Sequence, residues 1–428
     1  MLLVKDGFLV DPVSGRNGVF DILIEDGHVA EVDTCIEVKD SYEVIDAKGK
    51  YIMPGFVDLH EHFREPGYTY KETVKTGSMA AARGGFTSVF CMPNTKPVID
   101  SKDSYDALVD IIKNDACINV FPVGAITKGQ MGKELSEIEK MAESGMKAVS
   151  EDGKSVMNSL LCREGMKLAK ALNIPVFAHC EDIDLVCGGV MNEGKRAQML
   201  GLKGITNAVE DIIAARDIFL AKETGVRLHL CHVSTRDSVK MIKLAKEDGV
   251  NVTGEVCPHH FTLCDEDIPS DDSNYKMNPP LRSRMDMEAL IEGIRTGIID
   301  VISTDHAPHS AEEKSGSMNG SPFGIVGSET AFALSYTELV EKGHITLSEL
   351  VKCMSANPSR IAGIDRGSLN VGMAADFVIA DIDTWYEIDP DKFLSKGRNT
   401  PFAGRKVKGR IEKTFVNGCK VYEEDYND

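Results

Sequence analysis

The sequence predicts an α/β protein, a (β/α)8 TIM barrel with a small β-sandwich domain formed from both chain termini. Three observations favour this fold. Short apolar runs alternate with helical stretches through the middle of the chain, there are eight such runs, and both ends of the chain consist instead of short strand-like segments separated by turns. Repeated strand–helix alternation indicates a parallel sheet, and eight units are the number that a TIM barrel contains.

The eight apolar runs have the length of buried strands. They are Phe56–Leu59, Thr87–Cys91, Asn119–Gly124, Lys147–Ser150, Pro175–Ala178, Arg227–Cys231, Asn251–Val256 and Asp300–Ser303. A doubly wound open sheet would also alternate strands with helices. It does not require eight of them, so the barrel is the preferred prediction.

Helical patterns fill the gaps between these runs. They include Ser104–Lys113, Leu135–Ser144, Ser159–Leu172, Asn207–Thr224, Ser238–Glu247 and Met287–Arg295. Several helices end at a glycine suited to a left-handed cap, namely Gly84, Gly145, Gly225, Gly249 and Gly297. The long polar stretch Ser310–Ser321 follows the eighth run, and a loop of this length is expected to be a lid.

Both termini are predicted to be β-rich. The strand-like segments are Leu2–Val10, Phe20–Glu25, His28–Val32 and Glu43–Asp46 near the start, and Phe377–Asp381, Val407–Lys408 and Lys413–Tyr422 near the end. Asp26-Gly27 and Asn417-Gly418 are hairpin turn signals. We therefore expect a composite β-domain of residues 1–53 plus 366–428 and a barrel domain of residues 54–365.

Composition excludes several kinds of partner. The chain has 428 residues and a formal net charge of −19, and an acidic surface of this kind repels nucleic acid and anionic lipid. Its 11 cysteines are scattered without a CxxC pair, which favours reduced thiols. The start MLLVKDGFLVDP lacks the pattern of a signal peptide, and no apolar stretch is long enough to span a bilayer. We expect a cytoplasmic protein with no membrane or nucleic-acid partner.

Metal-binding residue types stand at the ends of five predicted strands. They are His60, His62, Asp152, His179, His232 and Asp305. Barrel enzymes place their active sites at the carboxyl ends of the strands, so these side chains are expected to converge. His60 and His62 are two residues apart on a strand and point to the same side. Six nitrogen and oxygen ligands are too many for one tetrahedral zinc, but they fit two ions that share a bridging group.

Other histidines and cysteines are expected to have lesser roles. His28, His229 and His344 are predicted to be structural, His306 to point away from Asp305, and Cys180 and Cys231 to pack on the side away from the metal. His259 and His260 end the seventh strand, where a supporting role behind the ligands is plausible.

Five strings resemble the dihydroorotase signature of the amidohydrolase superfamily. They are PGFVDLHEHFREPG at 54–67, CMPNT at 91–95, NPPLR at 278–282, STDHAPH at 303–309 and PFGIVGSET at 322–330. The resemblance runs nearly end to end and is to the bacterial type with an aspartate on the fourth strand. Hydantoinases and allantoinases carry a carboxylated lysine there. This chain has Asp152 instead, and Lys147 lies too far back to replace it. Where the family usually has a first aspartate this chain has Glu151, which could bind metal or point outward.

The resemblance implies a role for each matching residue. His60, His62 and Asp305 would hold one zinc and His179 and His232 a second, with Asp152 and a hydroxide bridging the two ions of each subunit. Asp305 would also be the catalytic acid–base. The substrate carboxylate would be held by Arg64, Asn94 and His309 and the ring by Asn278 and the backbone of Phe323 and Gly324, while His62 would also contact the substrate.

The activity that the resemblance implies is reversible, zinc-dependent cyclisation of N-carbamoyl-L-aspartate to (S)-dihydroorotate and water, a step of pyrimidine (UMP) biosynthesis. Two alternatives remain at this point. One is another cyclic amidase, an allantoinase or hydantoinase. The other is a non-catalytic dihydroorotase-like partner of aspartate transcarbamoylase, which would be expected to lack metal ligands. The family resemblance also implies a homodimer, and it leaves open an association of an active chain with aspartate transcarbamoylase.

Overall fold

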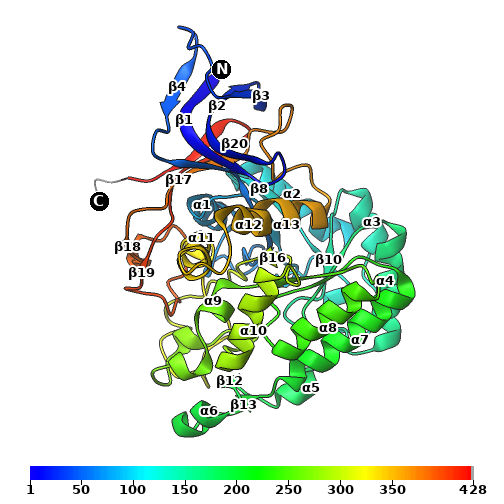
Figure 1. Ribbon diagram of the computed structural model, residues 1–428. Coiled ribbons are helices and arrows are strands. Elements are labelled where there is room, and N and C mark those ends of the chain that lie inside the picture. The colour runs from blue at the N-terminus through cyan, green and yellow to red at the C-terminus, as the bar shows by residue number, and fades with distance from the viewer. Residues whose placement is uncertain (426–428) are drawn as a thin grey trace.

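Parallel strands separated by helices form the main body of the protein in the computed structural model, which describes residues 1–425 (Figure 1). The strands are β6 (Phe56–Glu61), β7 (Phe86–Cys91), β8 (Asn119–Pro122), β9 (Gly124–Ala125), β10 (Val149–Ser150), β11 (Val176–Ala178), β14 (Leu228–Leu230), β15 (Val252–Val256) and β16 (Val301–Ile302). Each predicted apolar run contains strand structure, and the third run is divided between β8 and β9.

These strands pair in chain order. β6, β7 and β8 form one parallel sheet, and β9, β10, β11, β14, β15 and β16 form another. β8 runs directly into β9, and the amide of Val123 between them donates to the carbonyl of Cys91. At the other end, Glu61 forms a parallel bridge with His306, and the His62 amide donates to the His306 carbonyl at 2.9 Å. The first and last strands therefore meet just beyond their carboxyl ends.

The strands are buried on both faces, as expected for parallel strands covered by helices. Every residue of β6 and β7 is buried. Val57 and Leu59 pack in one apolar cluster with Phe177, while Phe56 and Val89 belong to a second cluster that includes the helices. This alternation follows from the two-residue period of a strand.

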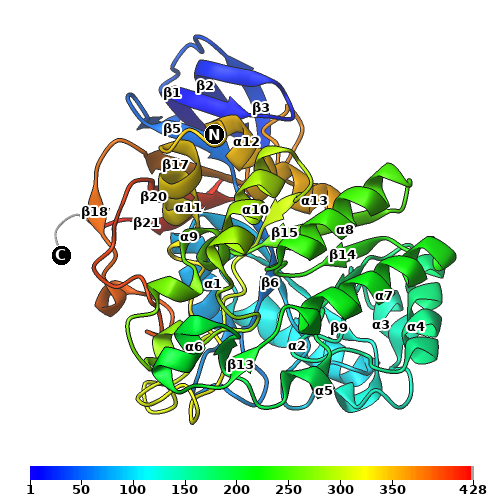
Figure 2. The ribbon, with the colours of Figure 1, turned by 60° about the horizontal axis from the view of Figure 1, so that its bottom comes forward.

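The helices lie outside the strands in both views (Figures 1 and 2). They are α1 (Val74–Arg83), α2 (Lys102–Asp115), α3 (Ile138–Glu143), α4 (Ser159–Ala171), α5 (Ile183–Val186), α6 (Lys195–Leu200), α7 (Ala208–Thr224), α8 (Arg236–Glu247), α9 (Pro258–Thr262), α10 (Arg284–Arg295), α11 (Ala331–Ser335), α12 (Leu347–Val351) and α13 (Asn357–Ala362). π-helical turns at Tyr336–Val340 and Lys352–Ala356 continue α11 and α12.

The expected helix ends are correct except at one glycine. Gly145, Gly225, Gly249 and Gly297 have the predicted positive φ. Gly84 instead keeps a right-handed conformation with φ −74°, and the next residue, Gly85, turns the chain with φ +89°. Two consecutive glycines made a turn predictable here. They did not indicate which of the two would have the positive φ.

Strands from both termini form one sheet, as the sequence predicted. It contains β1 (Leu2–Asp11), β2 (Arg16–Glu25), β3 (His28–Asp33), β4 (Glu43–Asp46), β5 (Tyr51–Pro54), β17 (Phe377–Asp381), β20 (Arg410–Val416) and β21 (Cys419–Glu423). Antiparallel pairing of β5 with β17 joins the N-terminal strands to the C-terminal ones. Asp26-Gly27 and Asn417-Gly418 have positive φ at both positions, which is the geometry of the predicted hairpin turns.

The expected strand at Val407–Lys408 lies elsewhere. It is β19 (Lys406–Val407), which pairs with β18 (Tyr386–Glu387) apart from the terminal sheet. A further short pair, β12 (Met191–Asn192) and β13 (Gly204–Ile205), lies beyond the carboxyl end of β11. Within residues 1–425, no helix combines the length and apolar character needed to cross a membrane.

Candidate active site

Six predicted ligands meet beyond the strand ends and are here called the rim cluster. Its members are His60, His62, Asp152, His179, His232 and Asp305, each at most 7% exposed. Asp152 lies at the centre. Its carboxylate oxygens are 3.1 Å from His60 Nε2, 3.4 Å from His62 Nε2, 3.5 Å from His179 Nδ1 and 3.7 Å from His232 Nε2. Asp305 Oδ1 completes the group at 3.1 Å from His62 Nε2 and 3.6 Å from His60 Nε2.

Two members of the rim cluster have an unusual backbone. His232 and Asp305 follow β14 and β16 with φ of +33° and +48°, a region that non-glycine residues rarely adopt. A positive φ interrupts the alternation of side chains along a strand. Both side chains therefore turn toward the cluster instead of continuing the strand pattern.

Three of the four histidines are fixed by a contact at their other nitrogen. His60 Nδ1 is 3.0 Å from Glu255 Oε1, His62 Nδ1 is 3.0 Å from Asn94 Oδ1, and His179 Nε2 is 3.1 Å from Glu181 Oε2. These oxygen atoms accept, so the outer nitrogens carry the hydrogens of neutral imidazoles. Such outer partners are typical of metal-binding histidines, whose inner nitrogens then present lone pairs.

Lone pairs consequently face one another inside the cluster. His60 Nε2 is buried without a hydrogen-bond partner, and His179 Nδ1 is 2.8 Å from His232 Nε2. Lone pairs that face one another repel unless a positive charge lies between them. Imidazole nitrogen and carboxylate oxygen are both ligands that zinc binds. The cluster therefore fits a divalent metal.

Glu151 points away from the rim cluster, which answers the question that the sequence left open. Its carboxylate accepts hydrogen bonds from the backbone amides of Ile126 at 3.1 Å and Thr127 at 3.0 Å. The residue is buried and anchors the loop after β9. Asp152 is the carboxylate of this strand end that reaches the cluster.

Both Cys180 and Cys231 pack in apolar clusters as predicted, but the side predicted for Cys231 was wrong. Cys180 packs in the apolar cluster shared with the helices. Cys231 faces the interior of the strands, where its sulfur, a His60 nitrogen and a Glu255 oxygen lie within 4.8 Å of one another. Regular alternation from His232 predicted the opposite side, and the positive φ of His232 breaks that alternation. Burial raises the pKa of the Cys231 thiol.

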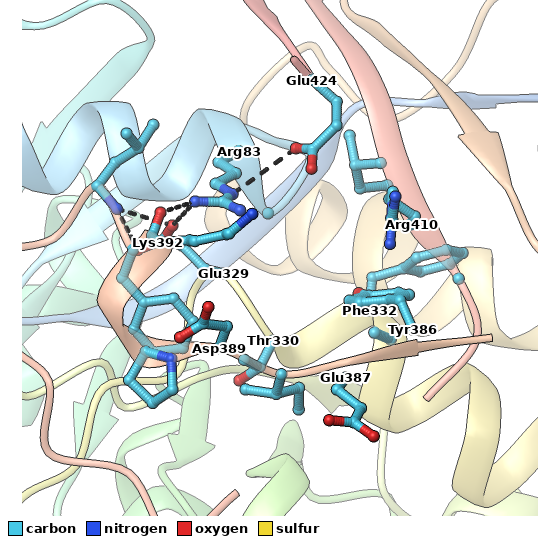
Figure 3. A pocket seen from close by; sticks show the side chains of 18 of the residues that line it. Arg83, Glu329, Thr330, Phe332, Tyr386, Glu387, Asp389, Lys392, Arg410 and Glu424 are labelled. Atoms are coloured by element: carbon cyan, nitrogen blue, oxygen red, sulfur yellow. Dashed lines mark hydrogen bonds and ion pairs between the residues drawn. The ribbon is translucent and has the colours of Figure 1, made fainter. Parts of the chain in front are cut away.

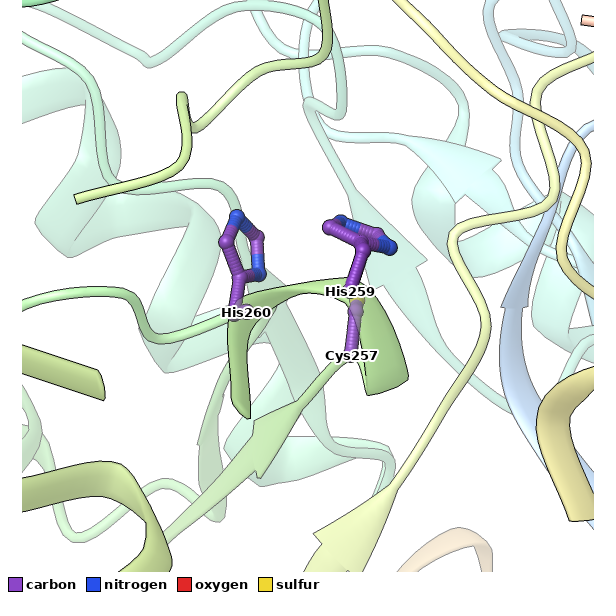
Figure 4. A group of neighbouring side chains, drawn as sticks. All are labelled: Cys257, His259 and His260. Atoms are coloured by element: carbon purple, nitrogen blue, oxygen red, sulfur yellow. The ribbon is translucent and has the colours of Figure 1, made fainter. Parts of the chain in front are cut away.

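His259 and His260 lie on α9, at the end of β15 (Figure 4). His260 Nε2 is 2.9 Å from the Pro279 carbonyl, while His259 Nε2 and His260 Nδ1 are buried without hydrogen-bond partners. Burial lowers the pKa of His259 to about 4. Within residues 1–425, neither histidine forms a hydrogen bond with a member of the rim cluster. The expected supporting role is therefore not based on a direct contact.

The remaining histidines lie where predicted. His306 turns from Asp305, and its Nδ1 accepts from the amide of Gly327 at 3.2 Å. His229 is structural, since its Nε2 is 3.0 Å from the carboxylate of Glu255 and thereby supports the partner of His60.

The predicted carboxylate-binding residues lie next to the rim cluster. Arg64 is half-buried, its Nε donates to the Pro308 carbonyl at 3.3 Å, and its Nη2 is 3.4 Å from His309 Nε2. Asn94 lies against the cluster itself, because its Nδ2 donates to Asp152 at 3.3 Å. Arg64 has φ +61°, which redirects the chain directly after β6.

The predicted ring-binding residues are also near one another. Asn278 Nδ2 donates to Glu181 Oε1 at 2.9 Å, so it is one residue removed from His179. The Phe323 carbonyl is 2.8 Å from His309 Nε2. Gly324 has φ +131°, and a Cβ there would lie 2.7 Å from the Cβ of Ala307. Its amide donates to the Lys276 carbonyl and its own carbonyl accepts from Lys314, so both polar groups of Gly324 are already bonded within the protein.

Sequence reasoning missed three charged residues that support the site. Glu255 and Glu181 orient His60 and His179, and Lys71 contacts His309. Glu181 follows His179 by two residues, a spacing that could have suggested it. The position of Lys71 depends on the path of a loop, for which the local sequence has no periodic signal.

A separate cavity of about 870 Å³ lies away from the rim cluster. It is bordered by the end of α1, by β18 and by the C-terminal strands (Figure 3). Arg83 is 3.3 Å from Glu329 and 3.9 Å from Glu424, and the guanidinium of Arg410 is 4.4 Å from the centre of the Tyr386 ring. None of its lining residues belongs to the rim cluster.

Known proteins resemble the chain along nearly its whole length. A family model described as dihydro-orotase-like matches residues 49–238. A protein of Acetivibrio thermocellus named dihydroorotase is 48% identical over 423 residues, with 99% of each chain covered. One of the same name from Pelotomaculum thermopropionicum is 49% identical, again with 99% of each chain covered. Among solved structures, the L-hydantoinase (dihydropyrimidinase) from Arthrobacter aurescens has a TM-score of 0.89 at 27% identity and covers 99% of this chain and 96% of its own.

Proposed function

The chain belongs to the dihydroorotase family, and we propose that its rim cluster is the centre at which the ring of dihydroorotate is opened and closed. Its function is that of a dihydroorotase, a hydrolase of cyclic amides. The observation that carries the assignment of the site is the position of Asp152, within 3.7 Å of four imidazole nitrogens and 3.3 Å from Asn94 Nδ2. Asp152 follows β10, the fourth strand of the predicted barrel. Hydantoinases and allantoinases have a lysine at this position, so the aspartate distinguishes the present subfamily from them.

We infer that the parallel strands close into a (β/α)8 barrel spanning residues 54–365. Support comes from the direct continuation of β8 into β9 and from the bridge between Glu61 and His306. Residues 1–53 and 366–428 would form the second, β-sandwich-like domain, of which residues 426–428 lie outside the described part of the chain. Pairing of β5 with β17 supports this division.

The metal proposed for the rim cluster is zinc, with two ions per subunit. His60, His62 and Asp305 would hold one ion, His179 and His232 the other, and Asp152 would be shared between them. When bound, zinc supplies an activated water at neutral pH and polarises the carbonyl under attack. The lone pairs that face one another in the cluster support this proposal, and the same atoms have no other cationic partner among the described residues.

The other steps, substrate binding and proton transfer, are assigned to individual side chains. Arg64 and His309 bind the substrate carboxylate, Arg64 through its planar fork of N–H groups. Asn94 contributes the second hydrogen of its amide nitrogen, and Asn278 and the Phe323 backbone contact the ring. During hydrolysis, the hydroxyl of water bonds to the amide carbon and Asp305 accepts the proton that water loses. Asp305 then delivers this proton to the ring nitrogen as the carbon–nitrogen bond breaks.

Ring closure runs through the same groups in reverse and converts N-carbamoyl-L-aspartate to dihydroorotate and water. We propose that this is the direction used in pyrimidine biosynthesis, and that the enzyme is cytoplasmic. All 11 cysteines are free, as expected in a reducing compartment. An association with aspartate transcarbamoylase stays a prediction from the family resemblance.

The test is a comparison of substrates on metal-analysed protein. Dihydroorotate, hydantoin and allantoin are assayed side by side with the wild type and with Arg64→Gln. The wild type should prefer dihydroorotate, and the variant should lose roughly 100-fold in kcat/KM for it, because a charge-assisted pair is removed. Preference for hydantoin or allantoin, or full dihydroorotate activity in the variant, would contradict the assignment.

A further inference from the structure

Lys71 lies behind the residues proposed to bind the substrate carboxylate. Its Nζ is 3.1 Å from His309 Nδ1 and 2.8 Å from Glu313 Oε1, and its side chain is 14% exposed. We propose that Lys71 is a positioning residue that holds His309 as a hydrogen-bond donor to the carboxylate and so tunes the enzyme to anionic substrates. This inference rests on the proposed function, because it concerns the same carboxylate-binding group.

Two contacts select the same tautomer of His309. An ammonium group can only donate, so His309 Nδ1 must accept from Lys71. The Phe323 carbonyl can only accept, and it lies 2.8 Å from His309 Nε2. A neutral imidazole satisfies both contacts only with its hydrogen on Nε2. Lys71 and the Phe323 carbonyl therefore act together on which nitrogen of His309 carries the hydrogen, and loss of Lys71 removes one of these two constraints.

The selected tautomer places two donors side by side. His309 Nε2 is 3.4 Å from Arg64 Nη2, and both atoms carry hydrogens. Two donors at this distance do not satisfy each other. A carboxylate placed between them can accept from Arg64 and share the Nε2 hydrogen with the Phe323 carbonyl in a bifurcated bond. The opposite tautomer would direct a lone pair from Nε2 at the Phe323 carbonyl and at an incoming anion. Loss of Lys71 would therefore weaken binding of a carboxylate without removing a group that touches it.

Positive charge also keeps His309 neutral. Burial and the neighbouring cations Arg64 and Lys71 lower the pKa of His309 to about 2. The imidazole consequently remains a neutral donor across the physiological range. Its role then depends on the tautomer that Lys71 selects rather than on a gain of charge.

Glu313 holds Lys71 in place. Its Oε1 accepts from Lys71 and from the Tyr70 hydroxyl at 3.2 Å, and its Oε2 accepts from the Ser310 amide at 3.2 Å. Burial opposes ionisation, but the ammonium of Lys71 and the Ser310 amide outweigh it and lower the pKa of Glu313 to about 2. The carboxylate thus connects the loop after β6 to the loop that begins at Ser310.

The test uses the zinc-loaded, full-length protein and four forms of it: wild type, Lys71→Met, Lys71→Arg and Lys75→Met. Lys75 is an exposed lysine four residues further on, so its replacement removes the same charge without touching His309. Lys71→Met should raise KM for dihydroorotate roughly tenfold and leave kcat within about threefold, since a ground-state contact is weakened. Lys71→Arg should recover most of the loss, and Lys75→Met should match the wild type.

Nitrogen NMR of the imidazoles provides a readout that a merely structural role would not move. The His309 signals are assigned by comparison with His309→Gln. In the wild type, Nδ1 should be an unprotonated acceptor and Nε2 should be protonated, and Lys71→Met should show a mixture of tautomers. A protonated Nδ1 in the wild type overturns the inference even if Lys71→Met fails to fold.

Unchanged KM and tautomer in a folded Lys71→Met protein also overturn the inference, and so does a fall in kcat without a rise in KM. In those cases, wild-type activity on dihydroorotate leaves the proposed function standing. A zinc-loaded wild type that does not hydrolyse dihydroorotate would instead reject the proposed function itself.

Discussion

Individual side chains explain why the rim cluster is arranged for a metal rather than for a set of internal hydrogen bonds. His60, His62 and His179 each give their outer nitrogen to a fixed acceptor, so each turns an inner lone pair toward Asp152. If the cluster were only structural, donors and acceptors would be expected to alternate. The orientation of the three imidazoles is set by their hydrogen-bond acceptors outside the cluster. Substitution of these acceptors is therefore the most informative test.

Glu181 allows that orientation to be tested. Glu181→Ala removes the acceptor of His179 Nε2, and loss of such a partner typically weakens metal binding by about 10- to 100-fold. We expect a corresponding rise in the zinc dissociation constant, measured by competition with a chromophoric chelator.

The matched control is Glu151→Gln, which alters a buried carboxylate that points away from the cluster. Its zinc affinity should equal that of the wild type. Equal affinity in Glu181→Ala would show that the contact with His179 does not support a ligand.

The sequence was sufficient to predict the six members of the rim cluster, because the carboxyl ends of parallel strands lie together and each member stands at such an end. It was not sufficient for Cys231, since nothing in the local pattern indicated the positive φ of His232. Lys71 was missed for a different reason. Its contact with His309 joins two loops that are far apart in the sequence, and amphipathic periodicity carries no information about loop paths.

At the scale of elements, strands were predicted better than their exact ends. β4 and β17 begin and end where expected, because turn residues bound them on both sides. β19 was assigned to the wrong sheet, since a two-residue strand does not specify its partner. The loop expected to be a lid is anchored by Lys314, which donates to the carbonyls of Lys276, Pro322 and Gly324, and lid motion stays a prediction.

Glu329 joins α1 to the segment after β18, and it makes the stability of the protein depend on pH. Its carboxylate accepts from the amides of Leu394 and Ser395 and lies 3.3 Å from Arg83. Burial is the main cause that raises the pKa of Glu329 to about 7, above its ordinary value of 4.5. Between these values the folded chain holds a proton that the unfolded chain releases. This contribution to stability is complete below pH 4.5 and is lost as the pH rises through 7.

Glu329→Gln should remove that dependence. The free energy of unfolding of the variant, relative to the wild type, should therefore increase from pH 5 to pH 8, by at most about 1.4 kcal/mol per pH unit. Chemical denaturation of both proteins at several pH values measures this difference, and other titrating groups cancel in the comparison. A difference that stays constant over this range would place the pKa of Glu329 near its ordinary value.

At the scale of the whole molecule, the composite sheet ties the two ends of the chain to each other, and the outer helices offer a surface for a second copy. Helices α4, α7 and α8 lie side by side (Figures 1 and 2). They expose Leu160, Ile212, Phe219 and Leu244, and Phe219 is 71% exposed. Large apolar side chains exposed on helices in contact favour an interface, and we propose that it is that of the expected homodimer.

Phe219→Asp should convert the dimer to a monomer, because it would bury a charge at that interface. Light scattering at micromolar concentration gives the mass of each form, and Phe219→Leu is the control that should remain dimeric. A wild type that is monomeric, or a variant that stays dimeric, would exclude this surface as the dimer interface.

Metal binding by the rim cluster is tested most directly by anomalous X-ray scattering, measured at the zinc edge on crystals of the zinc-loaded protein. We expect two peaks, one among His60, His62 and Asp305 and the other between His179 and His232, both next to Asp152. Peaks elsewhere, or no peak within the rim cluster, would contradict it.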